Sequence, residues 1–218
     1  MNKYTFFIIS TLFFSVVSSA QPVIDYKGEK INMLDDQDRQ VGIWKVYDEK
    51  NGYVIVMHFD NGIVIKGPLY YKGSELVAAF KGNNVELYEN GKIVNAHFHT
   101  EPKALPILID EAGKVIERKT HGYLYSVLPM YYGGNDELYR FIRNNFNKKL
   151  LKAGTGMVKV AFVIDEIGRT SLIKVVESSD PDLNEEAIRV ISISPRWQSS
   201  LQYGKYVRIS YAIPINFN

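Results

Sequence analysis

The most regular hydrophobic pattern in the chain lies close to its C-terminal end. Between residues 206 and 217 every second position is apolar or aromatic, namely Val207, Ile209, Tyr211, Ile213, Ile215 and Phe217. Successive side chains of a β-strand point to opposite faces, so this alternation predicts a strand with one buried face. Pro214 lies within that strand and has no backbone N–H to donate to a neighbouring strand. We therefore expect this strand to lie at the edge of its sheet.

Two helical segments precede this strand. Between residues 136 and 152 the apolar residues recur at helical spacing and share one face, namely Leu138, Phe141, Ile142, Phe146 and Leu150. Asn135 is the expected N-cap of this first helix. A second helix is expected to begin near Asp182, which forms a capping signature with Glu185 three residues later. The side chains that it should bury are Leu183, Ala187, Ile188 and Ile191.

A hairpin is expected between the two helices. Residues 157–164 and 170–178 are two apolar runs, and they flank a turn in which Asp165 comes first and Gly168 takes the positive-φ position. The C-terminal order is therefore helix, strand, strand, helix, strand. This order predicts an α+β unit from residue 129 to residue 218 with a three-stranded antiparallel sheet.

Residues 21–100 have a different pattern, made of short apolar runs separated by turn dipeptides. Asn51-Gly52, Asn61-Gly62 and Asn90-Gly91 are dipeptides that tight hairpin turns prefer, because both central residues need positive φ. We expect an antiparallel β-meander here, in which Trp44, Tyr47, Tyr70 and Tyr71 belong to the core and bind no ligand. Residues 101–128 should connect the two regions and contain one further hairpin.

Parts of this meander loosely resemble MORN repeats. The phrases that carry the resemblance are Gly42 to Tyr47, Gly67 to Tyr71 and Tyr88 to Gly91. Repeats of this kind form stacked hairpins, each with an aromatic face that only a neighbouring hairpin can bury. The alternative is an unrelated small β-sheet.

The first twenty residues predict a secretory signal peptide. Lys3 is followed by an apolar run to Val17, and Ser18-Ser19-Ala20 supplies the small residues that a signal peptidase reads. The apolar run is shorter than the roughly 20 residues that a spanning helix needs. We therefore expect an exported protein in the periplasm or on the periplasmic face of the envelope, with no membrane span after cleavage. The alternative is an uncleaved anchor in the inner membrane.

Charge and composition exclude several classes of function. The formal net charge is only +2, which gives no field strong enough to favour nucleic acid as a partner. The absence of cysteine excludes disulfides, thiolate nucleophiles and cysteine metal ligands. A hydrophobic fraction of 46% is typical of folded protein.

No cluster of residues predicts catalysis, a metal site or a cofactor. His97 and His99 could share one face of a strand, but no third ligand is visible near them. The acidic stretch from Asp35 to Asp38 lacks the glycine and the distal Glu of a calcium loop. No nucleophile elbow, phosphate-binding loop or zinc-protease helix is present. We expect a protein that is not an enzyme.

Residues 129–218 resemble the TonB C-terminal domain family. The segments that carry the resemblance are Tyr132 to Gly134, Gly156 to Asp165 with Gly168, Lys174 to Ser179, Asp182 to Ala187, Pro195 to Trp197, Gly204 to Val207 and Ile213 to Phe217. They occur in the order and at the spacing that the family has.

The resemblance implies binding and not chemistry. In this family an edge strand captures a short extended segment of an outer-membrane receptor, which links it to TonB-dependent transport across that membrane. The capture is strand addition, in which backbone groups pair and side chains set the preference. On this chain the pairing strand comprises Tyr206, Val207, Arg208, Ile209, Ser210, Tyr211, Ala212, Ile213 and Pro214.

The chain departs from the family pattern at its N-terminal side. Where the family has an inner-membrane anchor and a proline-rich spacer, this chain has the expected cleavable signal and a meander, and the whole chain contains only eight prolines. Force transmission therefore does not follow from the resemblance. Two hypotheses stay open: a module that binds a receptor or periplasmic peptide, and a structural envelope protein whose edge strand serves packing or a homodimer.

Overall fold

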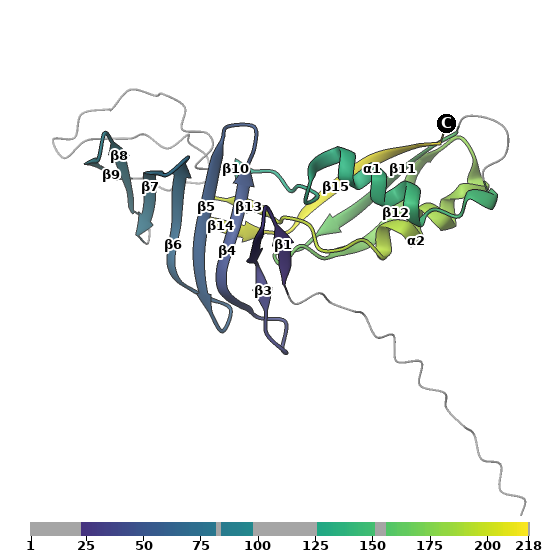
Figure 1. Ribbon diagram of the computed structural model, residues 1–218. Coiled ribbons are helices and arrows are strands. Elements are labelled where there is room, and N and C mark those ends of the chain that lie inside the picture. Colours follow the sequence, from purple (N-terminus) through teal and green to yellow (C-terminus); the bar gives the residue numbers. More distant parts are fainter. Residues whose placement is uncertain (1–22, 82–83, 98–125, 151–155, 218) are drawn as a thin grey trace, which may run out of the picture.

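The computed structural model describes residues 23–81, 84–97, 126–150 and 156–217, which form two lobes that meet in the middle of the molecule (Figure 1). The signal segment expected at residues 1–20 lies outside the described residues. So do the hairpin expected within the connection after residue 100 and two histidines, His99 and His121.

The N-terminal lobe contains an antiparallel meander of seven strands in sequence order. The strands are β3 (Met33–Leu34), β4 (Gln40–Asp48), β5 (Tyr53–Asp60), β6 (Ile63–Lys72), β7 (Glu75–Lys81), β8 (Asn84–Glu89) and β9 (Lys92–His97). Two of the expected turn dipeptides, Asn61-Gly62 and Asn90-Gly91, have positive φ at both residues. At the third dipeptide only Gly52 has positive φ, because the loop between β4 and β5 is longer. The meander is confirmed, and the likeness to MORN repeats stays a prediction.

A small hairpin packs beside the start of the meander. It consists of β1 (Ile24–Tyr26) and β2 (Glu29–Ile31). Ile24 and Ile31 are buried with Tyr47 of β4 in a separate cluster. The expectation that Trp44, Tyr47 and Tyr70 are buried is correct, whereas Tyr71 is only half-buried.

The C-terminal lobe has the expected order of helix, strand, strand, helix, strand. Its elements are α1 (Gly134–Asn145), the 3-10 turn η2 (Lys148–Leu150), β11 (Gly156–Ile164), β12 (Thr170–Ser178), the 3-10 turn η3 (Pro181–Leu183), α2 (Asn184–Ser192) and β15 (Ile209–Phe217). The strands form an antiparallel sheet of order β12-β11-β15, and both helices cover the same face (Figure 1). The fold is therefore α+β, with the three-stranded sheet that the sequence predicts.

Helix α1 differs from the expectation at both ends. It starts at Gly134, and the N-cap residue is Gly133, which has a φ of 91°. No side chain caps this end of the helix, so the prediction of Asn135 as N-cap was wrong. It ends at Asn145 because Phe146 adopts an extended backbone and turns its ring into the core. Leu150 still packs on that core from the short turn η2, which explains why the apolar period continues beyond the helix.

The second helix largely matches its expected face. Leu183, Ala187 and Ile191 are buried, but Val190 is buried in place of Ile188, which is half-buried. These side chains form one core with the inward residues of β11 and β15.

A third small sheet joins the lobes. It contains β10 (Ser126–Val127), β13 (Ser200–Gln202) and β14 (Lys205–Val207) in the order β10-β13-β14. Val127 and Leu201 are buried in the core of the meander, and Ile167 and Tyr206 pack against it. Residues from both sides of the boundary expected at residue 129 therefore share one hydrophobic core.

Candidate functional site

Strand β15 is an edge strand of the C-terminal sheet. Within the part of the chain that the structure describes, it pairs with β11 alone, from Gly156 opposite Phe217 to Ile164 opposite Ile209. Ile213 and Ile215 are buried, while Ser210, Ala212, Pro214 and Asn216 are exposed on the face that the helices leave uncovered. Pro214 thus occupies an edge strand, where a missing N–H is tolerated.

The nine residues expected to form one pairing strand are divided between two sheets. Tyr206 and Val207 belong to β14 and pair with Leu201 and Ser200. Ile209 to Pro214 belong to β15, and Arg208 lies between the two strands. The expectation of one continuous strand was therefore wrong at its N-terminal end.

The reason for the break is the environment of Tyr206. Its ring centroid lies 5.5 Å from that of Trp44 and 6.1 Å from that of Phe59, both in the core of the meander. Burial raises the pKa of the Tyr206 hydroxyl well above its ordinary value. Tyr206 therefore anchors the chain to the N-terminal lobe and is not part of the free edge of β15.

The hydrogen bonds on the side of β11 that faces β12 show which residues of β15 direct their backbone groups outward. The carbonyl of Met157 accepts from the backbone N–H of Ser179, which follows β12, at 2.9 Å, and the Met157 N–H donates to the Ser179 Oγ at 2.8 Å. The backbone N–H and C=O groups of the odd-numbered residues of β11 thus point to β12, because these groups alternate between the two sides of a strand. The backbone groups of the even-numbered residues point to β15, where these residues pair with odd-numbered residues.

It follows that the even-numbered residues of β15 direct their N–H and C=O groups to the free edge. Pro214 agrees with this assignment. It has no N–H to donate, and Lys159, the residue opposite it, does not need one because its backbone groups point to β12. Ser210, Ala212 and Asn216 therefore each present a backbone donor and a backbone acceptor outward. Ile209, Tyr211 and Ile213 use theirs in the ladder with β11.

The charge beside this edge is positive. Arg208 is exposed at the start of β15, and among the described residues it has no ion pair. A charged side chain at the end of an unpaired edge discourages non-specific pairing.

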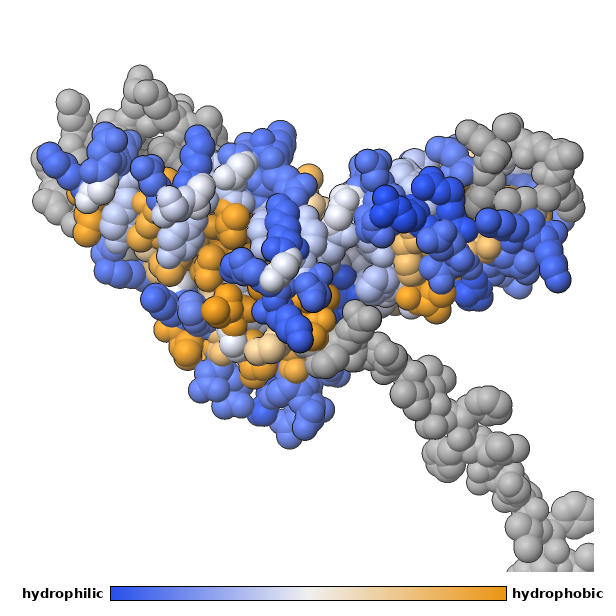
Figure 2. Space-filling model, in the orientation of Figure 1, coloured by the Kyte–Doolittle hydropathy of each residue, from blue (hydrophilic) through white to orange (hydrophobic). Residues whose placement is uncertain are grey.

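A second segment, at the start of β6, pairs with β5 but has no partner strand on its other side within the described residues. Ile63, Val64 and Ile65 are 67%, 42% and 67% exposed, and β7 pairs with β6 only from Leu69 onward. Apolar residues are visible on this lobe in Figure 2. The pairing of this segment with β5 contains two register shifts next to His58, so its backbone groups are not regularly spaced for a further strand. Of these two segments, only β15 has a regular edge.

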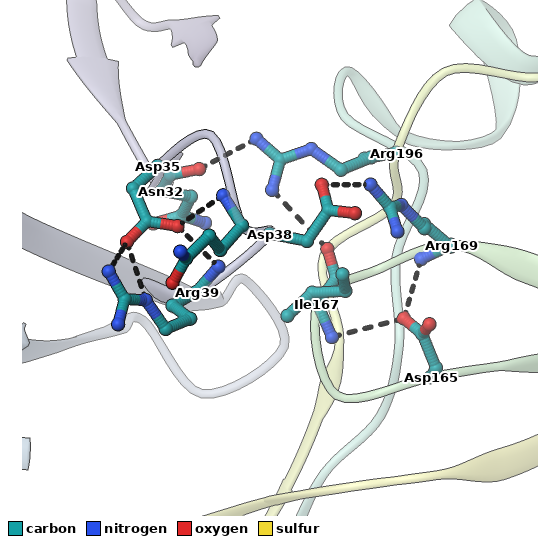
Figure 3. Close-up of polar contacts among 9 residues, drawn as sticks. Asn32, Asp35, Asp38, Arg39, Asp165, Ile167, Arg169 and Arg196 are labelled. Atoms are coloured by element: carbon teal, nitrogen blue, oxygen red, sulfur yellow. Dashed lines mark hydrogen bonds and ion pairs between the residues drawn. The ribbon is translucent and has the colours of Figure 1, made fainter. Parts of the chain in front are cut away.

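The lobes are tied together next to β15. Arg196 is buried, and its Nη2 donates to the Asn32 carbonyl at 2.6 Å while its Nη1 donates to the Ile167 carbonyl at 3.4 Å (Figure 3). Arg169 forms an ion pair with Asp38 across the same junction. These contacts fix the chain that leads from α2 to β15, and therefore fix the orientation of the free edge relative to the N-terminal lobe.

Neither acidic nor imidazole groups assemble into a site within the described ranges. No group of three His, Cys, Asp or Glu side chains is placed to hold a metal ion there. The carboxylate of Asp35 accepts from the N–H groups of Gln37 and Arg39, and these bonds help to lower its pKa. Asp35 thus closes its own turn. His58 lies half-buried in β5.

None of the helices in the described part of the chain is long and apolar enough to cross a membrane.

Comparison with known proteins gives one match. Residues 150–218 match the family model of the Gram-negative bacterial TonB protein C-terminal, a segment that contains β11, β12, α2 and β15. No curated protein and no solved structure matches the chain. The match confirms the resemblance to this family, which is associated with the cell envelope, typically interacts with outer-membrane receptors and is in general non-enzymatic.

Proposed function

We propose that the protein binds an extended segment of another envelope protein by strand addition at the free edge of β15. The observation that carries this proposal is the regular row of outward backbone groups at Ser210 and Ala212 in a strand that pairs with β11 alone within the described residues. An added strand would satisfy these donors and acceptors and extend the sheet. The family match supports the proposal, because the family typically interacts with a protein partner.

The partner is proposed to be an outer-membrane receptor or another protein with an extended segment in the periplasm. The side chains of Ser210 and Ala212 are small and offer little surface, so the backbone provides most of the pairing. Arg208 adds a preference for an acidic residue in the segment. No transduction of force is part of the proposal.

The proposal places the protein on the periplasmic side of the envelope and divides it as the sequence suggests. Residues 1–20 would be removed, residues 21–100 would form a platform, residues 101–128 a connection and residues 129–218 the binding module. Arg196 and Tyr206 join platform and module, so the platform would hold the binding edge in one orientation. Mass spectrometry of protein from the native host should find Gln21 as the first residue, whereas an intact Met1 would contradict the export proposal.

The binding experiment uses the full mature chain and overlapping peptides from the periplasmic segments of outer-membrane receptors of the same organism. Ala212→Pro removes one outward N–H, and Ala212→Val is the matched control because it keeps that N–H at the same exposed position. We expect at least one peptide to bind the parent and the valine variant and to lose at least tenfold in affinity for the proline variant.

Circular dichroism first establishes that the proline variant keeps its fold. If every peptide that binds the parent binds a folded Ala212→Pro protein equally well, β15 is not the binding edge. If no peptide binds the parent at all, the proposed partner class is wrong.

A second function is favoured by the shared core of the two lobes. Leu201 and Tyr206 pack with the meander, which suits a structural protein that acts as one rigid unit. In that case the β15 edge would pair with a second copy of the chain. Sedimentation should then detect a dimer of the parent that Ala212→Pro, but not Ala212→Val, converts to a monomer.

A further inference from the structure

One hydrogen bond already occupies part of the free edge. Tyr139 of α1 donates from its hydroxyl to the carbonyl oxygen of Pro214 at 3.3 Å. Tyr139 is half-buried and packs against the core between the helices and the sheet, while Pro214 is exposed. A side chain from the helical layer thus reaches the open side of the last strand.

The alternation of backbone groups along β15 shows which hydrogen-bonding position of the free edge the Tyr139 hydroxyl occupies. Pro214 has an even number, so its carbonyl points away from β11 like those of Ser210 and Ala212. A partner strand that continued past Ala212 would direct its own N–H at this carbonyl. It would meet an acceptor that Tyr139 already uses, and it would find no N–H on Pro214 for its own carbonyl.

We infer that Tyr139 and Pro214 together interrupt the docking edge before Asn216 and limit continuous strand addition to Ser210 and Ala212. This inference rests on the proposed function and specifies the length of the segment that the edge takes. Two neighbouring outward residues pair with a segment of about four extended residues, and a longer partner reaches the outward groups of Asn216 only past Pro214, where it finds no N–H and an acceptor already in use.

The limit has a physical use. A long unpaired edge can pair with any extended chain, and proteins shorten or interrupt such edges to prevent aggregation. Proline and a side-chain hydroxyl interrupt this edge without a bulge, since the pairing of β15 with β11 continues in register to Phe217. The hydroxyl also satisfies an exposed carbonyl in the absence of a partner.

The test measures affinity against peptide length for the full mature chain. Peptides that bind the parent are lengthened one residue at a time in the direction of Pro214. For the parent, we expect affinity to stop rising once the peptide spans Ser210 and Ala212.

Two variants should remove the limit separately. Tyr139→Phe frees the Pro214 carbonyl and keeps the ring in the core, and Pro214→Ala supplies the missing N–H. Each should bind the longer peptides about two- to tenfold more tightly than the parent, the range that one neutral hydrogen bond gives. Short peptides should bind all three proteins alike. Tyr211→Phe is the control, because the Tyr211 ring packs on the core face of the same strand, with its centroid 5.9 Å from that of Trp197, and loss of its hydroxyl should leave both series unchanged.

The outcomes separate this inference from the proposed function. If Ala212→Pro abolishes binding but the length series is the same in the parent, Tyr139→Phe and Pro214→Ala, the edge binds peptides and the proposed limit is wrong. If no peptide depends on Ala212, both are wrong.

Discussion

The side-chain amide of Gln198 forms two hydrogen bonds with the backbone of Tyr47. Its Oε1 accepts from the Tyr47 N–H at 2.7 Å, and its Nε2 donates to the Tyr47 carbonyl at 2.8 Å. A primary amide has the donor and acceptor of a peptide group, so Gln198 acts here as one unit of an additional strand. The side-chain amide of Asn32 makes the same pair of hydrogen bonds with the backbone of Lys45, which lies two residues before Tyr47 in β4. Side chains therefore cover the part of β4 that extends beyond its pairing with β3, in contrast to the free edge of β15.

Replacement of Gln198 should destabilise the whole protein. Gln198→Leu leaves the buried N–H and C=O of Tyr47 without partners, and each such group costs about 1–3 kcal/mol. We expect a loss of about 2–4 kcal/mol in the free energy of unfolding, measured by urea denaturation. Gln202→Leu is the control, because Gln202 is exposed in β13 and its replacement should change stability by less than about 0.5 kcal/mol. Equal effects of the two substitutions would show that the Gln198 bonds are unimportant.

Arg196 should contribute to the junction through its donors. Its guanidinium lies 5.9 Å from the Trp44 ring and is buried, and burial lowers the pKa of this group. Arg196→Met keeps much of the aliphatic contact but removes the donor to the Asn32 carbonyl. We expect a loss of about 1–3 kcal/mol in urea denaturation. The comparison is Arg208→Met, which changes an exposed arginine without an ion pair among the described residues. A smaller loss for Arg196→Met than for Arg208→Met would contradict this role.

The stability of the C-terminal lobe should fall in acid because of Glu186. Hydrogen bonds from Arg189 and from the Asn147 N–H lower the pKa of Glu186 below its ordinary value of 4.5. A carboxylate whose pKa is lower in the folded state stabilises the protein above its ordinary pKa. This stabilisation is lost as the pH falls through the lower, folded value.

Unfolding free energies measured between pH 6 and pH 3 test this expectation. The parent should lose stability below about pH 4.5, and Glu186→Gln should show a shallower loss over the same range. Glu185→Gln, at an exposed position one residue earlier, should follow the parent. A parallel loss in Glu186→Gln and the parent would exclude Glu186 as the cause.

Tyr206 should act through its ring and not through its hydroxyl. The hydroxyl oxygen is buried and has no hydrogen-bond partner among the described residues, so Tyr206→Phe should leave stability unchanged or slightly increased. Tyr206→Ala removes the ring that contacts Trp44 and Phe59 and should cost about 3–5 kcal/mol. Thermal and urea unfolding measure the stability of both variants. A large loss in Tyr206→Phe would mean that the hydroxyl has a partner.

The elements of the C-terminal lobe could be predicted because their signals are local. Alternation in β15 and the helical period in α2 follow from the geometry of the backbone, which is the same wherever the element lies. Pro214 indicated an edge strand for an equally local reason, the missing N–H. The same holds for Asn61-Gly62, where the turn requires two residues that tolerate positive φ.

The sequence also located the candidate binding strand, but it could not show which backbone groups face outward. Alternation tells which side chains are buried. The direction of the N–H and C=O groups depends on which neighbour a strand has on each side. Only the pairing of β11 with both β12 and β15 assigned the outward groups to Ser210 and Ala212.

The break between β14 and β15 at Arg208 could not be predicted from the sequence pattern, for a different reason. Tyr206 continues the β-strand composition of the residues that follow it, and nothing local distinguishes the two strands. What separates them is that Tyr206 packs on Trp44 in the other lobe.

The amino-acid sequence by itself therefore determined the main elements of the C-terminal lobe, their order and most of their buried faces, since these depend on the spacing of residues along the chain. Tertiary structure decided how the elements are joined. Gln198 and Tyr47 are 151 residues apart, and their two hydrogen bonds exist only because the meander and the C-terminal lobe share a core. Contacts between distant residues depend on the shapes and the unpaired polar groups that meet when the chain closes, and no period along the sequence records them.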